Sequence, residues 1–264
     1  MRAGDNANEA LLLAHVEDLF SRAASGVLAM TAFLTPHEQK LLSRHFAGKE
    51  AHFVFFGGYA EAERTRMILL PPYIADADEP WRACLIDEAR GEAVVSLEVR
   101  GSGYRTLTHR DFLGAVLHLG LKREVIGDIC VLDANHAVLF CDPRMAEFLK
   151  ENLTRVANDA VRIGESTLPP DFDGGRRFER LTDTVASPRL DAVVAALCRL
   201  SRERAQGLIT AEQVELDFEI TAKCDREVVA GAVVTVHGFG KYKIRSLGEL
   251  TKKGRLRLAA DRYV

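Results

Sequence analysis

The amino-acid sequence predicts an α+β protein with several domains, and two observations carry that prediction. Between residues 92 and 163, segments with strand and helix periodicity follow one another in the order β-α-β-β-α-β. From residue 187 onward, two amphipathic helices precede short strands with alternating apolar and polar residues. At 264 residues, the chain is long enough for more than one hydrophobic core.

Residues 1–75 predict a small α/β domain. Apolar side chains recur at helical spacing in residues 9–24, and Thr35 begins a capping box for a second helix. Two short apolar strands follow, at residues 51–56 and 67–70. A proline pair and an acidic run come next, and they predict a domain boundary before residue 76.

Residues 76–164 predict a central ferredoxin-like domain, because β-α-β-β-α-β is the element order of that fold and of RNA-recognition domains. The expected strands are residues 92–99, 127–132, 137–141 and 159–163, and the expected helices are residues 108–119 and 143–156. Bases stack on such a sheet through aromatic side chains on its central strands. Only Phe140 is available there, so we do not expect base stacking on this sheet.

Residues 187–264 predict a third domain, of two helices and a small twisted sheet. Leu190, Val193 and Leu197 share one face of the first helix, and Ser201 is a good N-cap for the second. Alternating strands follow from Val214, and a glycine-punctuated turn precedes Lys241.

Residues 165–186 predict a linker, because a proline pair and a glycine pair lie at their centre. A flexible segment of roughly 22 residues would span about 25 Å and let the last domain move independently. Alternatively, Phe172, Phe178 and Leu181 pin the segment to the rest of the protein. The sequence leaves both possibilities open.

The third domain resembles the S4 domain, a small RNA-binding module. The resemblance rests on Arg189-Leu190-Asp191, on Ser201-Arg202 and on the turn Gly238-Phe239-Gly240-Lys241, in that order. It implies that Arg189 and Arg202 line an RNA-facing surface. The full set of candidate RNA-binding residues is Arg189, Ser201, Arg202, Arg204, Gln206, Lys241, Lys243 and Arg245. Glu215 and Asp217 depart from the S4 pattern, because basic or amide residues are usual on that strand.

The distribution of charge agrees with an RNA-binding third domain. Residues 187–264 contain 14 Lys and Arg against 10 Asp and Glu, whereas the rest of the chain contains 21 against 28. Concentrated positive charge favours a phosphate backbone, since each neutralised phosphate releases condensed counterions. The alternative is a charged tail that is merely solvated.

A polar cluster in the central domain invites a catalytic interpretation. Thr108 caps a helix whose first turn holds His109 and Arg110, where backbone N–H groups favour an anion. The tripeptide His109-Arg110-Asp111 also occurs in kinase catalytic loops, but no phosphate-binding loop precedes it and no Asp-Phe-Gly follows. No nucleophile stands out either, so we expect a structural or RNA-contacting role.

These segments carry a second, longer resemblance, to the YlmH family of S4-domain proteins, which includes the photosystem II S4-domain proteins. It rests on three blocks, residues 57–64, 108–115 and 122–129, all followed by the S4-like domain. The motif residues, whose role the resemblance leaves open, are Gly57, Gly58, Arg64, His109, Arg110, Asp111, Lys122, Arg123 and Asp128. The resemblance implies a non-enzymatic factor that binds the large ribosomal subunit, contacts ribosomal and transfer RNA, and serves the rescue of stalled translation.

The remaining expectations concern environment and chemistry. No apolar run is long enough for a membrane helix and no signal-peptide pattern is present, so we expect a cytoplasmic protein without a membrane partner. Five scattered cysteines form no CxxC pair, and we expect neither a metal nor a cofactor. Off the ribosome we expect a monomer. Two alternative functions are an S4-targeted RNA-modifying enzyme, such as a pseudouridine synthase, and a protein-interaction scaffold with an S4 fold.

Overall fold

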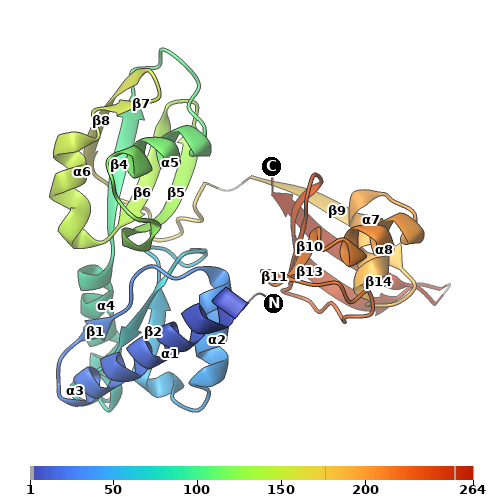
Figure 1. The fold of residues 1–264 in the computed structure, drawn as a ribbon, viewed down its shortest axis with the longest axis horizontal. Coiled ribbons are helices and arrows are strands. Elements are labelled where there is room, and N and C mark those ends of the chain that lie inside the picture. Colours follow the sequence, from blue (N-terminus) through green and yellow to red (C-terminus); the bar gives the residue numbers. More distant parts are fainter. Residues whose placement is uncertain (1–2, 176, 253, 264) are drawn as a thin grey trace. The chain divides into compact units, whose positions relative to one another are not determined.

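The computed structural model describes residues 3–175, 177–252 and 254–263, and residues 1, 2, 176, 253 and 264 lie outside that description (Figure 1). The chain forms two compact units, Met1–Gly175 and Arg176–Val264. Each unit combines helices with sheets, which confirms the α+β class predicted from the sequence.

The first unit opens with a three-stranded antiparallel sheet covered by two helices. Its elements are α1 (Ala3–Ala24), β1 (Ala29–Met30), α2 (Pro36–His45), η1 (Glu50–His52), β2 (Phe53–Phe56) and β3 (Arg66–Leu69), with strand order β1-β3-β2. The predicted capping box is present: Thr35 accepts a hydrogen bond from the Glu38 backbone and donates its own N–H to the Glu38 carboxylate at 2.6 Å. Val16 of α1, Leu42 of α2 and Met67 of β3 meet in one core.

Two helices occupy the place where the sequence predicts a domain boundary. They are α3 (Pro72–Ala75) and α4 (Trp81–Ala93). Helix α4 packs against β3 and α3 and buries Ile86, Ala89 and Ala93. Residues 1–75 and 76–164 lie in the same compact unit, and their division into two domains within it stays a prediction. The sequence did not predict α4, because small or charged residues on this helix hide its apolar face.

The central part of the first unit has the predicted element order β-α-β-β-α-β. These elements are β4 (Val95–Gly101), α5 (His109–His118), β5 (Ile126–Asp133), β6 (His136–Cys141), α6 (Ala146–Asn152) and β8 (Asp159–Glu165). Short elements flank them: η2 (Arg123–Val125), η3 (Pro143–Met145) and β7 (Arg155–Val156). The strand order is β5-β6-β4-β8-β7, and all neighbours are antiparallel.

One face of this five-stranded sheet is covered by helices, and the other face is covered over β5 and β6. On one face, Leu97 and Leu139 pack against Phe112 of α5 and Leu149 of α6. On the other face, Val138 and Phe140 pack against Phe33, Ile68 and Ile86, which come from the N-terminal part and α4. The side chain of Phe140 is fully buried. Phe140 is therefore not available for base stacking, in agreement with the expectation from the sequence. Over β4 and β8, the second face carries the exposed side chains of Arg100 and Arg162.

The second unit is a six-stranded antiparallel sheet with two helices on one face. Its elements are β9 (Phe178–Val185), α7 (Leu190–Cys198), α8 (Arg202–Thr210), β10 (Val214–Leu216), β11 (Glu219–Ile220), β12 (Val233–Val236), β13 (Gly240–Leu250) and β14 (Leu256–Tyr263). The strand order is β11-β10-β12-β13-β14-β9. The predicted helix pair is present, and α7 buries Leu190, Val193 and Leu197 against the sheet.

The predicted linker, residues 165–186, is divided between the two units. Phe172 packs on the rings of Tyr59 and Phe140 in the first unit. Residues 178–185 form β9, which pairs with β14 along its whole length, from Phe178 opposite Tyr263 to Val185 opposite Leu256. Of the two possibilities that the sequence left open, these contacts favour a segment that is held by packing at Phe172 and by strand pairing at residues 178–185. The strand had no local signal, because its partner lies at the far end of the chain.

Candidate functional site

The candidate site of the second unit is built around a carboxylate, Asp191. Its side chain is fully buried near the start of α7. Arg189, the N-cap of α7, donates to both carboxylate oxygens at 3.3 Å, and Arg202, the first residue of α8, donates to both at 3.1 Å. The side-chain amide of Gln206 donates to Oδ2 at 2.8 Å. Arg189, Arg202 and Gln206 are three of the predicted RNA-binding residues, and all three donate to Asp191. Asp191 itself was not among the candidates.

Electrostatics keep this carboxylate charged. Burial by itself raises the pKa of Asp191, but the hydrogen bonds from Arg202, Gln206 and Arg189 outweigh it and lower the pKa to about 2. Two cations then share one anion, so the cluster is positive overall. The side chains of Arg189 and Arg202 are 42% and 50% exposed. Because each uses only Nε and Nη2 on Asp191, Nη1 is left for an anionic ligand.

Two other predicted residues of α8 have different positions. Ser201 is the N-cap, and its hydroxyl accepts a hydrogen bond from the backbone N–H of Arg204 at 3.2 Å. Its role is to stabilise the helix that carries Arg202. Arg204 is exposed and lies two residues beyond Arg202, on another side of α8. It does not join the Asp191 cluster.

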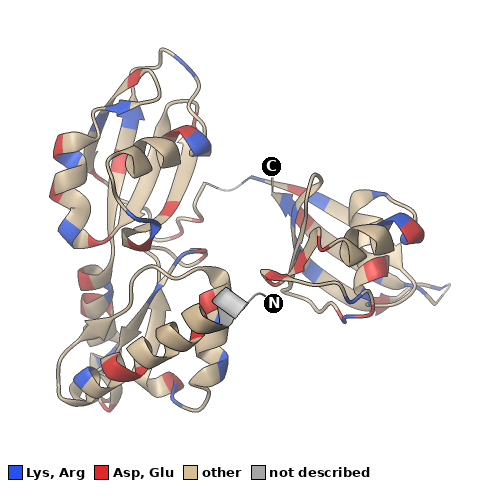
Figure 2. Cartoon of the chain, in the orientation of Figure 1, with Lys and Arg blue, Asp and Glu red and all other residues tan. Residues whose placement is uncertain are grey.

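Lys241, Lys243 and Arg245 lie on the opposite side of the sheet from this cluster. They alternate along β13 with Tyr242 and Ile244, whose buried side chains pack in the core beneath α7 and α8. Strand alternation therefore points the three cations to the face that the helices do not cover. Lys and Arg accordingly occur on both strands and helices of the second unit (Figure 2). The candidate residues from Arg189 to Arg245 therefore lie on two surfaces of the second unit.

The acidic residues that depart from the S4 pattern have structural partners. The carboxylate of Asp217 accepts a hydrogen bond from the backbone N–H of Val233 at 2.9 Å. This contact holds the turn after β10, where Asp217 itself has a positive φ of 51°. Glu215 lies 3.4 Å from the His237 ring. Both carboxylates are thus engaged within the unit.

In the first unit, the blocks 57–64 and 122–129 meet at Asp128. Its carboxylate accepts hydrogen bonds from the hydroxyl of Tyr59 at 2.7 Å and from the backbone N–H groups of Glu63 and Arg64 at 2.8 and 3.0 Å. The Arg64 guanidinium in turn donates to the backbone carbonyls of Ile126, Phe33 and Arg123. These motif residues tie the loop after β2 to the start of β5. Their role in the structure is to hold the first unit together.

The two glycines of that loop are required by close packing. A Cβ on Gly57 would lie 2.3 Å from the Arg64 carbonyl oxygen. Gly58 has a φ of +103°, and its Cβ would lie 2.2 Å from the Phe140 ring. This packing explains the diglycine without a phosphate ligand.

The residues around the start of α5 remain at the surface. Thr108 and Asp111 form a capping box, as predicted. His109 is exposed, but desolvation of its ring and the nearby charge of Arg123 lower its pKa. Arg110 and Asp111 line an open groove of about 590 Å³, together with His118, Asn152 and Arg155. Lys122 is exposed just beyond, as the N-cap of η2.

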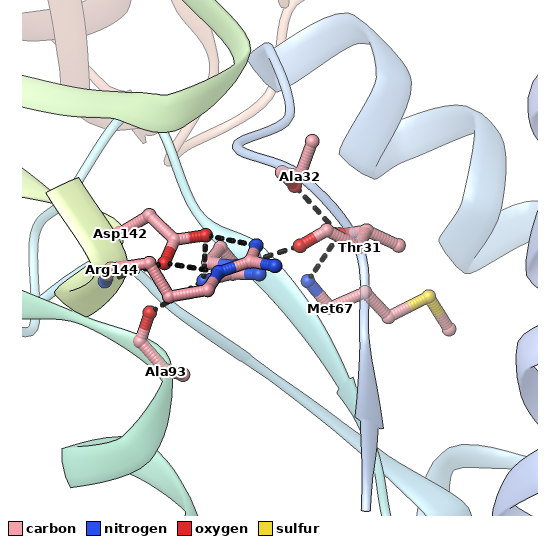
Figure 3. Close-up of polar contacts among 7 residues, drawn as sticks. Thr31, Ala32, Met67, Ala93, Asp142 and Arg144 are labelled. Atoms are coloured by element: carbon pink, nitrogen blue, oxygen red, sulfur yellow. Dashed lines mark hydrogen bonds and ion pairs between the residues drawn. The ribbon is translucent and has the colours of Figure 1, made fainter.

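The first unit contains a second cluster, around the buried Asp142, which the sequence did not predict. Arg66, 4% exposed, donates to Asp142 at 3.1 Å, to the Ala93 carbonyl at 2.9 Å and to the Thr31 carbonyl at 2.6 Å. Arg144 Nη2 donates to the same carboxylate at 2.6 Å. Figure 3 shows Asp142 and Arg144 beside Ala93 and Thr31. This cluster joins β3 and β1 to the end of α4 and to the segment after β6.

Among the described residues, no group of His, Cys, Asp and Glu side chains is placed to hold a metal ion. All five cysteines are free thiols, and Cys141 is buried, which raises its pKa to about 12. None of the described helices is both long enough and apolar enough to cross a membrane.

The fold and these clusters define a two-unit α+β protein with an arginine-rich surface at the start of a helix pair. Two family models match the chain, "YlmH, N-terminal" over residues 9–74 and "Putative RNA-binding domain in YlmH" over residues 95–169. A curated relative, the ribosome-associated protein quality control protein P2 of Bacillus subtilis (strain 168), is 30% identical over 235 residues. The match covers 89% of this chain and 87% of the relative. The chain belongs to the YlmH family.

A solved structure is also similar, the cell division protein ylmH from Streptococcus pneumoniae. It is 22% identical, with a TM-score of 0.42, and the match covers 63% of this chain and 93% of that chain.

Proposed function

We propose that this protein is an RNA-binding factor that associates with the large ribosomal subunit, contacts ribosomal and transfer RNA, and acts in quality control of stalled translation. The name of the Bacillus subtilis relative supports the ribosome and quality control. The family model over residues 95–169 supports RNA binding. In this proposal, the protein is cytoplasmic and is a monomer off the ribosome.

The fold assignment belongs to the same proposal. The strand order β5-β6-β4-β8 supports a ferredoxin-like core in the first unit. The helix pair α7 and α8 on one face of a small antiparallel sheet supports an S4 domain in the second. In this proposal, the N-terminal and the ferredoxin-like domains pack together in residues 1–175, and the S4 domain includes β9.

The observation that carries RNA binding is the cluster around Asp191. A buried carboxylate fixes the planes of Arg189 and Arg202 while about half of each side chain stays exposed. A guanidinium held in this way loses little further conformational freedom when it binds, and its free edge matches a phosphate. The net positive charge of the cluster favours an anionic backbone. Arg204, exposed on the same helix, adds a phosphate contact at the rim.

The first unit is proposed to contact RNA through its helix side rather than through its sheet. Phe140 of the central strand β6 is buried, so it offers no ring on which a base could stack. The groove that Arg110 and Arg155 line is open to solvent, and Asp111 in its wall is already engaged in the capping box. This groove offers cationic side chains to a phosphate backbone.

A non-enzymatic role completes the proposal. Asp128, which lies near His109, is engaged in holding the loop 57–64, and the pKa of His109 is lowered by desolvation and by Arg123. The motif residues Gly57, Gly58, Arg64 and Asp128 have packing roles. In this proposal, His109 and Arg110 contact RNA.

Sedimentation through a sucrose gradient tests the proposed function. Tagged protein in lysate should travel with the large subunit at low salt and leave it at high salt. Arg202→Gln should shift the protein toward the top at a lower salt concentration, because a glutamine can still donate to Asp191 but carries no charge. Arg22→Gln, an equally neutral change at an exposed site of α1, is the control. A protein that stays at the top at every salt concentration would refute ribosome association.

A further inference from the structure

The uncovered face of the second unit's sheet carries aromatic rings among cations. Phe178 of β9 and Tyr263 of β14 are opposite each other in register, with ring centroids 5.0 Å apart and planes at 71°. The amino group of Lys241 lies 5.1 Å from the Tyr263 centroid and 4.9 Å from the Phe218 centroid. The Arg245 guanidinium lies 5.6 Å from the Phe178 centroid. We call Phe178, Phe218, Tyr263, Lys241 and Arg245 the outer-face cluster.

The buried carboxylate of Asp261 positions two arginines, Arg180 and Arg245, near Phe178. Asp261, 7% exposed, accepts a hydrogen bond from Arg245 Nε at 2.6 Å, and Arg180 Nε lies 3.5 Å from its other oxygen. Two guanidiniums again share one carboxylate, which repeats on this face the arrangement around Asp191. The side chains of Arg180 and Arg245 are 69% and 38% exposed. The region is therefore positive and reaches solvent.

The aromatic rings are accessible even though the cluster is ordered. Phe178 is 37% exposed, and Phe218 and Tyr263 are half-buried. The aliphatic and aromatic residues that alternate with the cluster, Tyr242 and Ile244 among them, point inward to the helix-covered core. The rings are thus not part of that core.

We propose that the outer-face cluster binds single-stranded RNA, with bases stacked on Phe178 and Tyr263 and the phosphates between them held by Lys241 and Arg245. A ligand that suits this surface must offer both a flat π-face and negative charge, which a nucleotide does. A protein partner fits less well, because the cores of protein interfaces are depleted of lysine. A duplex fits less well also, since its bases are already stacked on one another. This inference rests on the proposed RNA-binding function and adds a second contact to it.

Fluorescence anisotropy with a labelled oligouridylate of about 12 nucleotides tests the inference on the full-length protein. Phe178→Leu combined with Tyr263→Leu keeps the surface apolar and removes both rings. The variant should bind this RNA about 5- to 100-fold more weakly for each base that loses its stack. Binding of a duplex of matching length should change by less than about twofold. Tyr73→Leu, which removes a 58% exposed ring from the first unit, is the control.

The salt dependence separates stacking from charge. Lys241→Met should lower the slope of log affinity against log salt by about 0.7, the value for one phosphate of a single strand. The double leucine variant should leave the slope unchanged. Thermal unfolding checks that both variants are folded.

Three outcomes would overturn the inference: no binding of the oligouridylate by the natural protein, unchanged binding by the double leucine variant, or an equal loss for duplex and single strand. None of them touches the proposed function, which depends on sedimentation with the ribosome and on Arg202. Where the second outcome comes with loss of ribosome association by the double leucine variant, the outer face is a protein contact.

Discussion

The two larger sheets of the protein differ in what lies on the face that is not packed against a helix pair. In the first unit, the five-stranded sheet has α5 and α6 on one face, and the N-terminal part with α4 covers β5 and β6 on the other. In the second unit, α7 and α8 cover one face of the six-stranded sheet, and the other carries cations and aromatic rings. A βαββαβ core is therefore no guide to where RNA binds, because burial decides which face a ligand can reach.

The same contrast separates the arginine clusters. Arg66 and Asp142 are each 4% exposed, so their ion pair joins elements of the first unit and cannot reach a ligand. Arg202 also holds a buried carboxylate, Asp191, but half of its side chain is exposed. An arginine fixed on one edge and open on the other is suited to binding. Both clusters pair an arginine with a buried carboxylate. The exposed fraction of the arginine side chain distinguishes the binding role from the structural role.

The largest expected effect concerns the buried ion pair of Arg66 with Asp142 in the first unit. Arg66→Met leaves Asp142 buried without its buried partner, and we expect a loss of about 3–5 kcal/mol in the free energy of unfolding. Arg144→Met removes the 77% exposed partner of the same carboxylate and should cost about 1 kcal/mol. Urea denaturation measures both. Equal losses would show that burial does not distinguish the two arginines.

The next effect concerns packing of the loop after β2 against Phe140. Gly58→Ala combines a positive φ with a clash against the Phe140 ring, and we expect a loss of about 2–4 kcal/mol. Gly48→Ala is the matched control, because Gly48 also has a positive φ, +87°, but its Cβ would meet nothing within 4 Å. It should cost only about 1 kcal/mol. Thermal unfolding of both variants isolates the contribution of the clash.

A pH titration of stability tests the cluster around Asp191. The pKa of Asp191 is about 2 in the folded protein and near its ordinary value of 3.8 when unfolded. Because the folded pKa is the lower, the cluster stabilises the fold above pH 3.8, and that contribution disappears as the pH falls toward 2. It should amount to about 2 kcal/mol. Urea denaturation at pH 5 and pH 2.5 measures it as the difference between the natural protein and Asp191→Asn. The same pH dependence in both proteins would contradict the assignment.

Much of the fold was predictable from local sequence patterns. Elements whose packing partners lie far away in the sequence were not. The helix pair after Ser187 and the β-α-β-β-α-β order were predictable, because apolar spacing is read within a dozen residues. Strand β9 was missed since its edge is satisfied only by β14, and α4 was missed because its buried face is largely alanine. The packing that unites residues 1–175 in one compact unit was not predictable for the same reason, because it joins residues far apart in the sequence.

The candidate site divides in a similar way. Arg189, Arg202 and Gln206 were predictable from the resemblance, but Asp191, to which all three donate, was not singled out. A carboxylate two residues after one arginine and eleven before the other was the available signal. The outer-face cluster had no signal, because Phe178 and Tyr263 meet only through the pairing of β9 with β14.

The smallest expected effect compares one substitution on the two sheets. Phe140→Leu removes a fully buried ring from the covered sheet and should cost about 1–2 kcal/mol. Phe178→Leu makes the same change on the open face, where the ring is 37% exposed and contacts Tyr263, and should cost about 0.5 kcal/mol. Urea denaturation of both variants measures the difference. A cost at Phe178 as large as that at Phe140 would mean that the outer-face cluster is needed for folding. A small cost would mean that its rings are available to a ligand without loss of the fold.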